Sequence, residues 1–316
     1  MNALRDPYGR VIDSLRILVT LNCNYNCIFC HREGLQGFPR EELTPDDYGF
    51  LAEVASKLGM LFYKISGGEP LLRPDIVEIV SELRPHAREI SLVTNGYLLR
   101  KYASRLASAG LDRVNVSLHA LNEKLYRYIT NAHASPREVI AGIDEALQYG
   151  IKVKLNFLAM KSNLSEFFSL LEFAELRGLD VNLIELMPLG VPVEVFSSEH
   201  VPLKRILSFL EEKSVAKYYR ELQNRPVYVL SSGIKVEVVI GFENPLFCSK
   251  CSRIRLTPDG RLKPCLYVEN LYVNALEAIK ARDKVGLIKA FHEVIQLRKP
   301  YFDLKGAFSC QQKWSI

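Results

Sequence analysis

Short apolar runs and amphipathic stretches alternate along the chain up to Leu189. The apolar runs predict strands at Arg16–Thr20, Phe62–Ser66, Glu89–Val93, Arg113–Ser117, Lys152–Ala159 and Asp180–Leu186. Between them, apolar residues recur with the period of a helix, at Pro45–Leu58, Pro74–Leu83, Leu98–Ala109, Pro136–Tyr149 and Leu164–Arg177. About six such β–α units predict the α/β class with a parallel sheet, here an incomplete (β/α)6 TIM-like barrel.

Residues at the predicted helix ends support this pattern. Thr44 and Ser135 each stand before a proline, where a side-chain oxygen can cap the first turn. A glycine follows three of the predicted helices, where a left-handed C-cap is wanted: Gly110, Gly150 and Gly178.

The pattern changes after Leu189. The segment Gly190–His200 is rich in proline, serine and β-branched residues, which predicts a linker. Beyond it lie a predicted helix, two strand-like runs and a Pro-Asp-Gly hairpin turn, at Leu203–Lys213, Val227–Leu230, Lys235–Ile240 and Pro258–Gly260. We therefore expect two domains, a partial barrel at residues 1–189 and a C-terminal α+β domain at residues 190–316.

Composition narrows the class of protein. The 316 residues are 48% hydrophobic and 24% charged, as in an ordinary soluble globular protein. Charged residues interrupt the N-terminal stretch, and no apolar run is long enough for a signal peptide or a membrane-spanning helix. We therefore expect a cytoplasmic protein with reduced thiols and no membrane partner. The net charge of +5 is mild and does not indicate nucleic-acid binding.

The first group of clustered cysteines directly follows the first predicted strand. Cys23, Cys27 and Cys30 form a C-x3-C-x2-C motif, and thiolates this close together suit an iron–sulfur cluster. Three thiolates leave one iron of a four-iron cluster open to a small molecule, which implies chemistry. Zinc is the alternative, but structural zinc usually takes four ligands and His31 is the one local candidate for the fourth.

A second group of cysteines lies near the C-terminus. Cys248, Cys251 and Cys265 form a C-x2-C-x13-C motif, and the hairpin turn brings Cys265 back beside the pair. Strand alternation places Arg253 and Arg255 on one face, where two guanidinium groups suit a polyphosphate. Taken alone, this motif fits three-quarters of a zinc ribbon equally well.

Polar and glycine-rich segments follow the predicted strands at the edge where parallel sheets bind ligands. The second strand runs into Gly67-Gly68-Glu69-Pro70, where paired glycines let backbone approach a ligand and Glu69 can bind an ammonium group. The fourth strand ends at Ser117, and the sixth runs into Met187. Each alone is equally a turn, a polar loop or core packing.

Together, these motifs resemble the GTP 3',8-cyclase family of the radical S-adenosylmethionine (SAM) superfamily, from Leu15 through Tyr301. The resemblance implies a lyase with two 4Fe–4S clusters and SAM as cofactors. A 5'-deoxyadenosyl radical abstracts the 3' hydrogen of GTP, and the ribosyl radical attacks carbon 8 of guanine. The product, (8S)-3',8-cyclo-7,8-dihydroguanosine 5'-triphosphate, opens molybdenum cofactor (molybdopterin) biosynthesis.

The resemblance also implies roles for individual residues. The cluster ligands are Cys23, Cys27, Cys30, Cys248, Cys251 and Cys265. The SAM-binding positions are Phe29, Gly68, Glu69, Ser117 and Met187. The GTP-binding positions are Arg16, Lys64, Lys154, Arg253 and Arg255. No side chain is assigned a catalytic role, because the radical is generated on SAM.

Departures from the family pattern leave the substrate open. Lys64 stands where the family commonly has arginine, Val93 replaces a hydroxyl residue, and Asn182 replaces an arginine. The chain ends without the Gly-Gly of many relatives, so we expect its tail to lie outside the active site, with Cys310 as a non-ligand thiol.

Two alternative functions therefore remain. The first is a related radical SAM enzyme with an auxiliary cluster and another substrate, such as a peptide. The second is a non-catalytic iron–sulfur or zinc protein that binds a partner. The expected partners of the first interpretation are GTP, an electron donor and a downstream cyclic pyranopterin synthase, and a homodimer is compatible with it.

Overall fold

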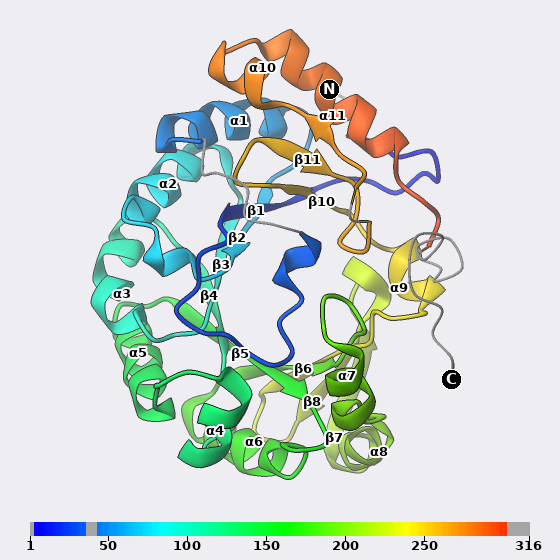
Figure 1. Cartoon of the computed structure of the whole chain (residues 1–316). Coiled ribbons are helices and arrows are strands. Elements are labelled where there is room, and N and C mark those ends of the chain that lie inside the picture. Colours follow the sequence, from blue (N-terminus) through cyan, green and yellow to red (C-terminus); the bar gives the residue numbers. More distant parts are fainter. Residues whose placement is uncertain (1–2, 36–42, 269, 302–316) are drawn as a thin grey trace.

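The computed structural model of the chain describes residues 3–35, 43–268 and 270–301. In it, a single curved sheet of twelve strands surrounds a central space (Figure 1). The strand order is β12-β11-β10-β1-β2-β3-β4-β5-β6-β9-β8-β7. Six parallel strands form its centre: β1 (Ser14–Thr20), β2 (Phe62–Gly67), β3 (Glu89–Thr94), β4 (Arg113–Ser117), β5 (Lys152–Ala159) and β6 (Asp180–Glu185). The expected parallel α/β fold is confirmed.

Helices cover the outer face of these strands, as Figure 1 shows. They are α1 (Pro45–Lys57), α2 (Ile76–Leu83), α3 (Leu99–Ser108), α4 (Glu123–Thr130), α5 (Pro136–Gln148) and α6 (Glu166–Arg177). Thr44 and Ser135 form capping boxes, and the three predicted C-cap glycines have positive φ angles. The sequence did not predict the short helix α4.

The C-terminal part extends both edges of the sheet. On one side, β9 (Lys235–Val239) pairs in parallel with β6 and continues through β8 (Pro226–Leu230) to β7 (Ser214–Tyr219). On the other, β10 (Arg253–Leu256) pairs in parallel with β1 and continues through β11 (Arg261–Lys263) to β12 (Val273–Asn274). The division into two domains at residue 189 stays a prediction.

In the described part of the chain, five further α-helices accompany these strands. They are α7 (Val193–Glu199), α8 (Lys204–Lys213), α9 (Pro245–Ser249), α10 (Leu276–Lys280) and α11 (Lys284–Gln296). The expectation of a plain linker at Gly190–His200 is wrong, because α7 occupies its middle. Pro192 stands at the N-cap, where its missing N–H costs nothing, and Phe196 stacks on His200. Packing here overrides the low helix propensity of valine and serine.

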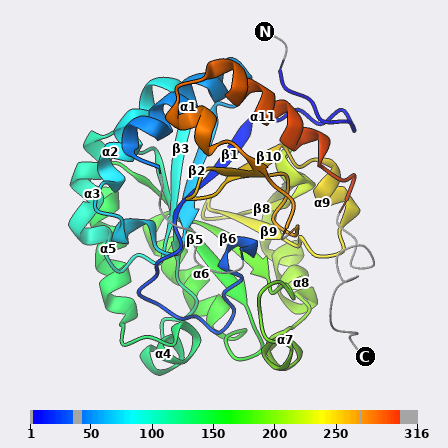
Figure 2. The same ribbon diagram turned by 45° about the horizontal axis from the view of Figure 1, so that its top comes forward.

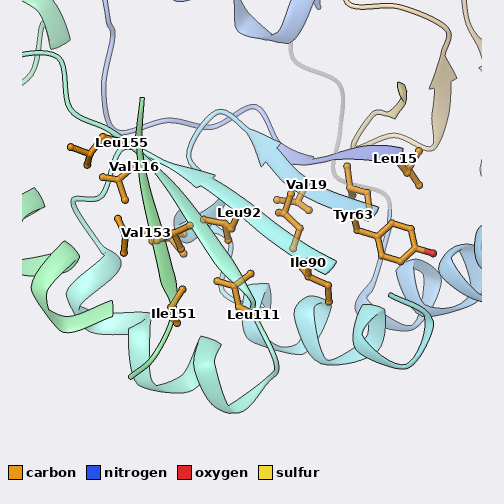
Figure 3. Packing of buried hydrophobic residues seen from close by; sticks show 14 of the residues in the cluster. Leu15, Val19, Tyr63, Ile90, Leu92, Leu111, Val116, Ile151, Val153 and Leu155 are labelled. Carbon is orange, nitrogen blue, oxygen red and sulfur yellow. The ribbon is translucent and has the colours of Figure 1, made fainter. Parts of the chain in front are cut away.

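Side chains alternate between the two faces of the sheet. Leu15, Tyr63, Leu92, Val116 and Leu155 belong to the core cluster and lie between strands and helices (Figure 3). The intervening residues face the ring, and many are polar: Arg16, Lys64, Ser66, Asn115, Ser117, Asn156 and Asn182. A closed TIM barrel usually fills its interior with branched apolar side chains. The polar side chains of this interior instead indicate that it binds a polar ligand.

Asp47 joins the barrel to the C-terminal helices, which lie beside α1 (Figure 2). Its carboxylate accepts a hydrogen bond from the Thr44 N–H at 2.8 Å and pairs with Lys280 at 2.6 Å and Arg282 at 2.8 Å. Burial acts to raise the pKa of Asp47, but these partners, Lys280 foremost, lower it from 3.8 to about 2. The carboxylate therefore stabilises the fold fully above pH 3.8 and loses this effect as the pH falls towards 2.

We expect Asp47→Asn to lower the free energy of unfolding by about 2 kcal/mol near neutral pH, because a helix cap and two ion pairs are lost. Urea denaturation measures this difference. It should shrink by about half at pH 3, where the wild-type carboxylate is partly protonated in the unfolded chain. Asp46→Asn is the matched control, since the Asp46 side chain is 81% exposed. An undiminished difference at pH 3 would contradict this account.

Candidate active site between two cysteine sets

One large cavity occupies the inside of the ring. Its volume is about 1400 Å³, which exceeds the ~300–1000 Å³ of an ordinary small-molecule pocket. Strands of the barrel and segments of the C-terminal part both line it. All six cysteines of the two predicted sets lie on its wall, and none of them is in a disulfide. The cavity can therefore hold more than one ligand.

The N-terminal cysteine loop follows β1 and passes in front of the ring's centre in Figure 1. Two backbone hydrogen bonds of 2.8 Å fasten its beginning to the glycine pair, from Gly68 N–H to Thr20 C=O and from Glu69 N–H to Asn22 C=O. A Cβ on Gly68 would lie 2.3 Å from the Asn22 carbonyl oxygen. The sequence predicted that backbone would approach a ligand here, and the structure shows that Gly68 also lets the cysteine loop itself approach.

The thiols of Cys23, Cys27 and Cys30 are suited to bind one shared cationic centre. Burial raises the pKa of all three, to about 11 for Cys23, and their mutual repulsion adds to the effect on Cys27. Three thiolates side by side therefore need a cation. Among the described residues, no three Cys, His, Asp or Glu side chains are arranged to hold a single metal ion. Three thiolates are the donor set of an iron–sulfur cluster with an open iron.

Four of the five predicted SAM-binding residues line the cavity: Phe29, Gly68, Ser117 and Met187. The ring of Phe29 packs edge-on against His119, with centroids 4.8 Å apart. His119 in turn accepts a hydrogen bond from the Leu158 N–H at 3.1 Å, so the aromatic wall is fixed from β5. The Met187 sulfur accepts a hydrogen bond from the Tyr267 hydroxyl at 2.9 Å.

Glu69, the fifth predicted SAM-binding residue, does not line the cavity. Its carboxylate is fully buried and accepts hydrogen bonds from Leu71 N–H at 2.9 Å, Thr94 Oγ1 at 2.8 Å and Asn95 N–H at 2.7 Å. Burial raises the pKa of Glu69 to about 7, against the lowering effect of these donors. The side chain links the ends of β2 and β3 through these hydrogen bonds and so fixes the position of one strand end relative to the other.

The C-terminal cysteine set is held by three ionic residues from distant parts of the sequence. Arg10 donates to the Cys248 carbonyl at 2.9 Å, and Arg298 donates to the Cys251 carbonyl at 2.6 Å. Both arginines pair with the buried carboxylate of Asp6. Burial acts to raise the pKa of Cys251, but Arg298 and Arg253 outweigh it, so the pKa is lowered. The cations at this end of the cavity therefore favour the thiolate form of Cys251.

Four predicted GTP-binding residues form a cluster of positive charge beside this set. Arg16 on β1 is in register with Arg255 on β10 and with Lys64 on β2, and Arg253 precedes Arg255 on the same strand. Burial, with repulsion from Arg253 and Arg16, holds the pKa of Lys64 well below its usual value. Burial likewise lowers the pKa of Arg253 to about 9, with Arg16 adding to it. Such mutual repulsion is relieved by a bound polyanion.

Glu33 is one cavity residue that sequence reasoning missed. It lies in a short turn after Cys30 (η1, Arg32–Gly34), in which Arg32 and Glu33 have φ angles of 45° and 52°. This strained turn aims the carboxylate at Arg16, 3.0 Å away, and at the Ser66 hydroxyl, 2.6 Å away. Two consecutive positive φ angles at non-glycine residues leave no signal in the sequence.

Lys154, the fifth predicted GTP-binding residue, lies outside the cavity wall. Its ammonium group is 2.6 Å from Glu237 on β9. The same carboxylate pairs with Arg220 at 3.1 Å and Arg225 at 2.9 Å. Of these, Arg225 lines the cavity, and sequence reasoning missed it too. Val93 and Asn182, where the sequence departs from the family pattern, also line the cavity.

Several buried polar atoms have no hydrogen-bond partner among the described residues, and most belong to side chains on the cavity wall. These are Arg16 Nε, Glu33 Oε2, Asn115 Oδ1, Asn182 Oδ1, Arg225 Nε, Arg253 Nε and Arg255 Nε. Buried polar groups are nearly always paired, so this concentration indicates a polar ligand. Cys310 and the C-terminal tail lie outside the described residues, so their predicted roles stay predictions.

Comparisons with known proteins agree with this geometry. The Radical SAM superfamily profile matches residues 17–174, and the Molybdenum Cofactor Synthesis C profile matches residues 179–304. A "Probable GTP 3',8-cyclase" of Pyrobaculum aerophilum is 40% identical over 307 residues, covering 95% of this chain and 98% of that protein. The chain belongs to the GTP 3',8-cyclase family of the radical SAM superfamily. It is therefore a radical SAM enzyme, and the interpretation as a non-catalytic binding protein is wrong.

Further relatives give the same picture. A protein of the same name from Saccharolobus islandicus is 42% identical over 95% of this chain and 99% of its own length. Streptococcus suis SuiB, solved bound to S-adenosylmethionine, has a TM-score of 0.69 at 15% identity, over 92% of this chain and 69% of that chain. The anSMEcpe structure with bound AdoMet has a TM-score of 0.59 at 16% identity, over 90% of this chain and 83% of that one. These two structures show the fold.

We expect Gly68→Ala to detach the cysteine loop, because the added Cβ would clash with the Asn22 carbonyl. Hydrogen exchange across residues 20–30 should accelerate at least tenfold, which corresponds to about 1.4 kcal/mol of lost local stability. Gly150→Ala is the control for strain outside the cysteine loop, because alanine is unfavourable at its φ of 75° but a Cβ there meets nothing within 4 Å. Unchanged exchange in Gly68→Ala, or equal acceleration in both variants, would refute the fastening role of Gly68.

Proposed function

We propose that this enzyme cyclises GTP to (8S)-3',8-cyclo-7,8-dihydroguanosine 5'-triphosphate, the first step of molybdenum cofactor biosynthesis. Curated relatives at 40–42% identity carry the name of this activity, and the chain covers 98–99% of their length. The observation that carries the proposal is the cavity itself. One thiol set lies beside an aromatic and glycine-lined wall, and the other lies beside buried cations in excess of carboxylates.

The proposal places SAM at the N-terminal set. Cys23, Cys27 and Cys30 would hold a 4Fe–4S cluster whose open iron is the SAM site. Phe29, fixed by His119, would lie along the adenine. Gly68, Ser117 and Met187 would line the rest of this site. Glu69 would not contact SAM and would instead position the ends of β2 and β3 that line this site.

The proposal places GTP at the C-terminal set. Cys248, Cys251 and Cys265 would hold a second cluster, and its open iron would take the base. Arg253 and Arg255 would grip the triphosphate together with Arg16 and Lys64, since guanidinium groups match phosphate in shape and charge. Binding by Lys154 stays a prediction, because its ammonium group would first have to leave Glu237.

When bound, the reduced cluster and SAM supply the radical that removes the 3' hydrogen of the substrate. The chain's own contribution is positioning, because the ring holds both ligands at fixed places in one cavity and shields them from bulk water. Reduction of the cluster requires an electron donor, and we propose such a donor as a partner of the enzyme. A downstream cyclic pyranopterin synthase, a homodimer and a cytoplasmic location stay predictions. No helix in the described part of the chain is long and apolar enough to cross a membrane.

A peptide substrate gains no support from the site. The similar solved structures include SuiB bound to a precursor peptide, but at 16% identity this likeness concerns the fold alone. A peptide backbone is uncharged, whereas Arg16, Lys64, Arg253 and Arg255 gather several positive charges in a buried place. Such a cluster suits a polyphosphate.

Anaerobic incubation with SAM, dithionite and GTP tests the proposal. The enzyme reconstituted with about eight irons per chain should form 5'-deoxyadenosine and a cyclised GTP product in equal amounts, detected by mass spectrometry. Formation of 5'-deoxyadenosine without conversion of GTP would contradict the proposed substrate.

Arg255→Ala should weaken GTP binding by about 1.5–3 kcal/mol, because a charge-assisted contact is lost. Isothermal titration under anaerobic conditions measures it, and SAM affinity should not change. Arg261→Ala is the matched control in the next strand, since Arg261 pairs with Asp259 and lies outside the cavity wall. Equal GTP affinity in both variants would show that Arg255 does not bind the triphosphate.

A further inference from the structure

A loop between β7 and β8 reaches from the edge of the sheet to the C-terminal cysteine set. It contains a short turn (η4, Leu222–Asn224), in which Gln223 and Asn224 have φ angles of 63° and 47°. Neither is glycine, so the surrounding structure must hold both in an unfavourable conformation. The Gln223 N–H donates to the Lys250 carbonyl at 2.9 Å, which docks the loop beside Cys251. Strain of this kind clusters at functional sites.

Arg225 ends this turn and brings a buried guanidinium group to the cavity. Its side chain is 12% exposed and lines the cavity. Nη1 donates to Glu237 at 2.9 Å, and Nη2 donates to the side chain of Gln223. Nε is buried without a partner among the described residues. Glu237 and Gln223 therefore orient the guanidinium group, and its Nε–H remains available as a hydrogen-bond donor.

The charges behind Arg225 do not balance. The Glu237 side chain is 3% exposed and pairs with three cations, Lys154, Arg220 and Arg225. Asp180 also acts on Lys154, so two carboxylates face three cations, and positive charge remains at this place. Arg225 is the one of the three that lines the cavity. It also lies close enough to repel Arg16, Lys64 and Arg253, the cations of the proposed triphosphate site.

We propose that Arg225 binds the phosphate groups of the substrate, and that Glu237 and Gln223 position it for this contact. The proposal rests on the proposed function, since it assigns a further residue to the same nucleotide. A guanidinium fork fits phosphate oxygens, and its free Nε–H is available to them. The loop from η4 would thus add a cation that comes from none of the strands β1, β2 and β10, which carry the other cations of the site.

The test compares Arg225→Gln, Arg225→Lys and Arg220→Gln with the wild type. Arg220 shares Glu237, but its side chain is 42% exposed and does not line the cavity, so Arg220→Gln is the matched control. Dissociation constants for GTP, guanosine and SAM are measured anaerobically on the reconstituted enzyme. Circular dichroism and thermal melting report whether each variant folds.

We expect Arg225→Gln to weaken GTP binding about 10- to 100-fold, the range of one charge-assisted contact, and to leave guanosine and SAM binding within about twofold. Arg225→Lys keeps the charge without the fork and should recover part of the loss, even if the glutamine variant folds poorly. Arg220→Gln should change GTP binding less than about threefold.

Three results would overturn the proposal. GTP binding could be unchanged in Arg225→Gln, guanosine binding could fall as much as GTP binding, or Arg220→Gln could cause an equal loss. Each would leave Arg225 as a structural residue while the wild type still converts GTP. A wild-type enzyme that does not bind GTP would instead refute the proposed function itself.

Discussion

Uncompensated positive charge inside the ring is the constraint on which this structure depends. Arg253 and Arg255 are buried and Arg16, Lys64 and Arg225 are partly buried, and these five cations lie close enough to repel one another. The nearby carboxylates of Glu33 and Glu237 offset part of this charge. A folded chain tolerates such repulsion only if the surrounding packing enforces it, and a polyanionic ligand relieves it. The extensive apolar core between strands and helices supplies that packing.

The sheet explains how two cysteine sets more than 200 residues apart in sequence come to face one cavity. The parallel pairing of β10 with β1 brings the strand that carries Arg253 and Arg255 beside the strand that leads into the N-terminal cysteine loop. The pairing of β9 with β6 extends the other side, and the pairing of β8 with β9 brings Glu237 to Arg225. Each edge of the barrel is thus completed by the C-terminal part, and with it the wall of the cavity.

Much of this was predictable from sequence because it depends on local order. The six central strands lie within two residues of their predicted ends, since strongly apolar runs between caps and glycines define them. The cysteines were identified by spacing, and Arg253 and Arg255 by strand alternation. The loop at Gln223, the turn at Glu33 and the pairing of Lys154 with Glu237 were not predictable, because strained backbone and distant partners determine them. Glu69 was placed at the SAM site by motif, whereas its carboxylate turns inward to neighbouring backbone.

We propose that one cavity holds SAM and GTP so that the 3' carbon of the nucleotide lies next to the 5' carbon of SAM. Turnover of GTP deuterated at the 3' position tests it most directly. We expect 5'-deoxyadenosine to gain one deuterium atom from each molecule of substrate converted. Deuterium-free 5'-deoxyadenosine formed alongside the cyclised product would contradict it, because the hydrogen would then have come from elsewhere.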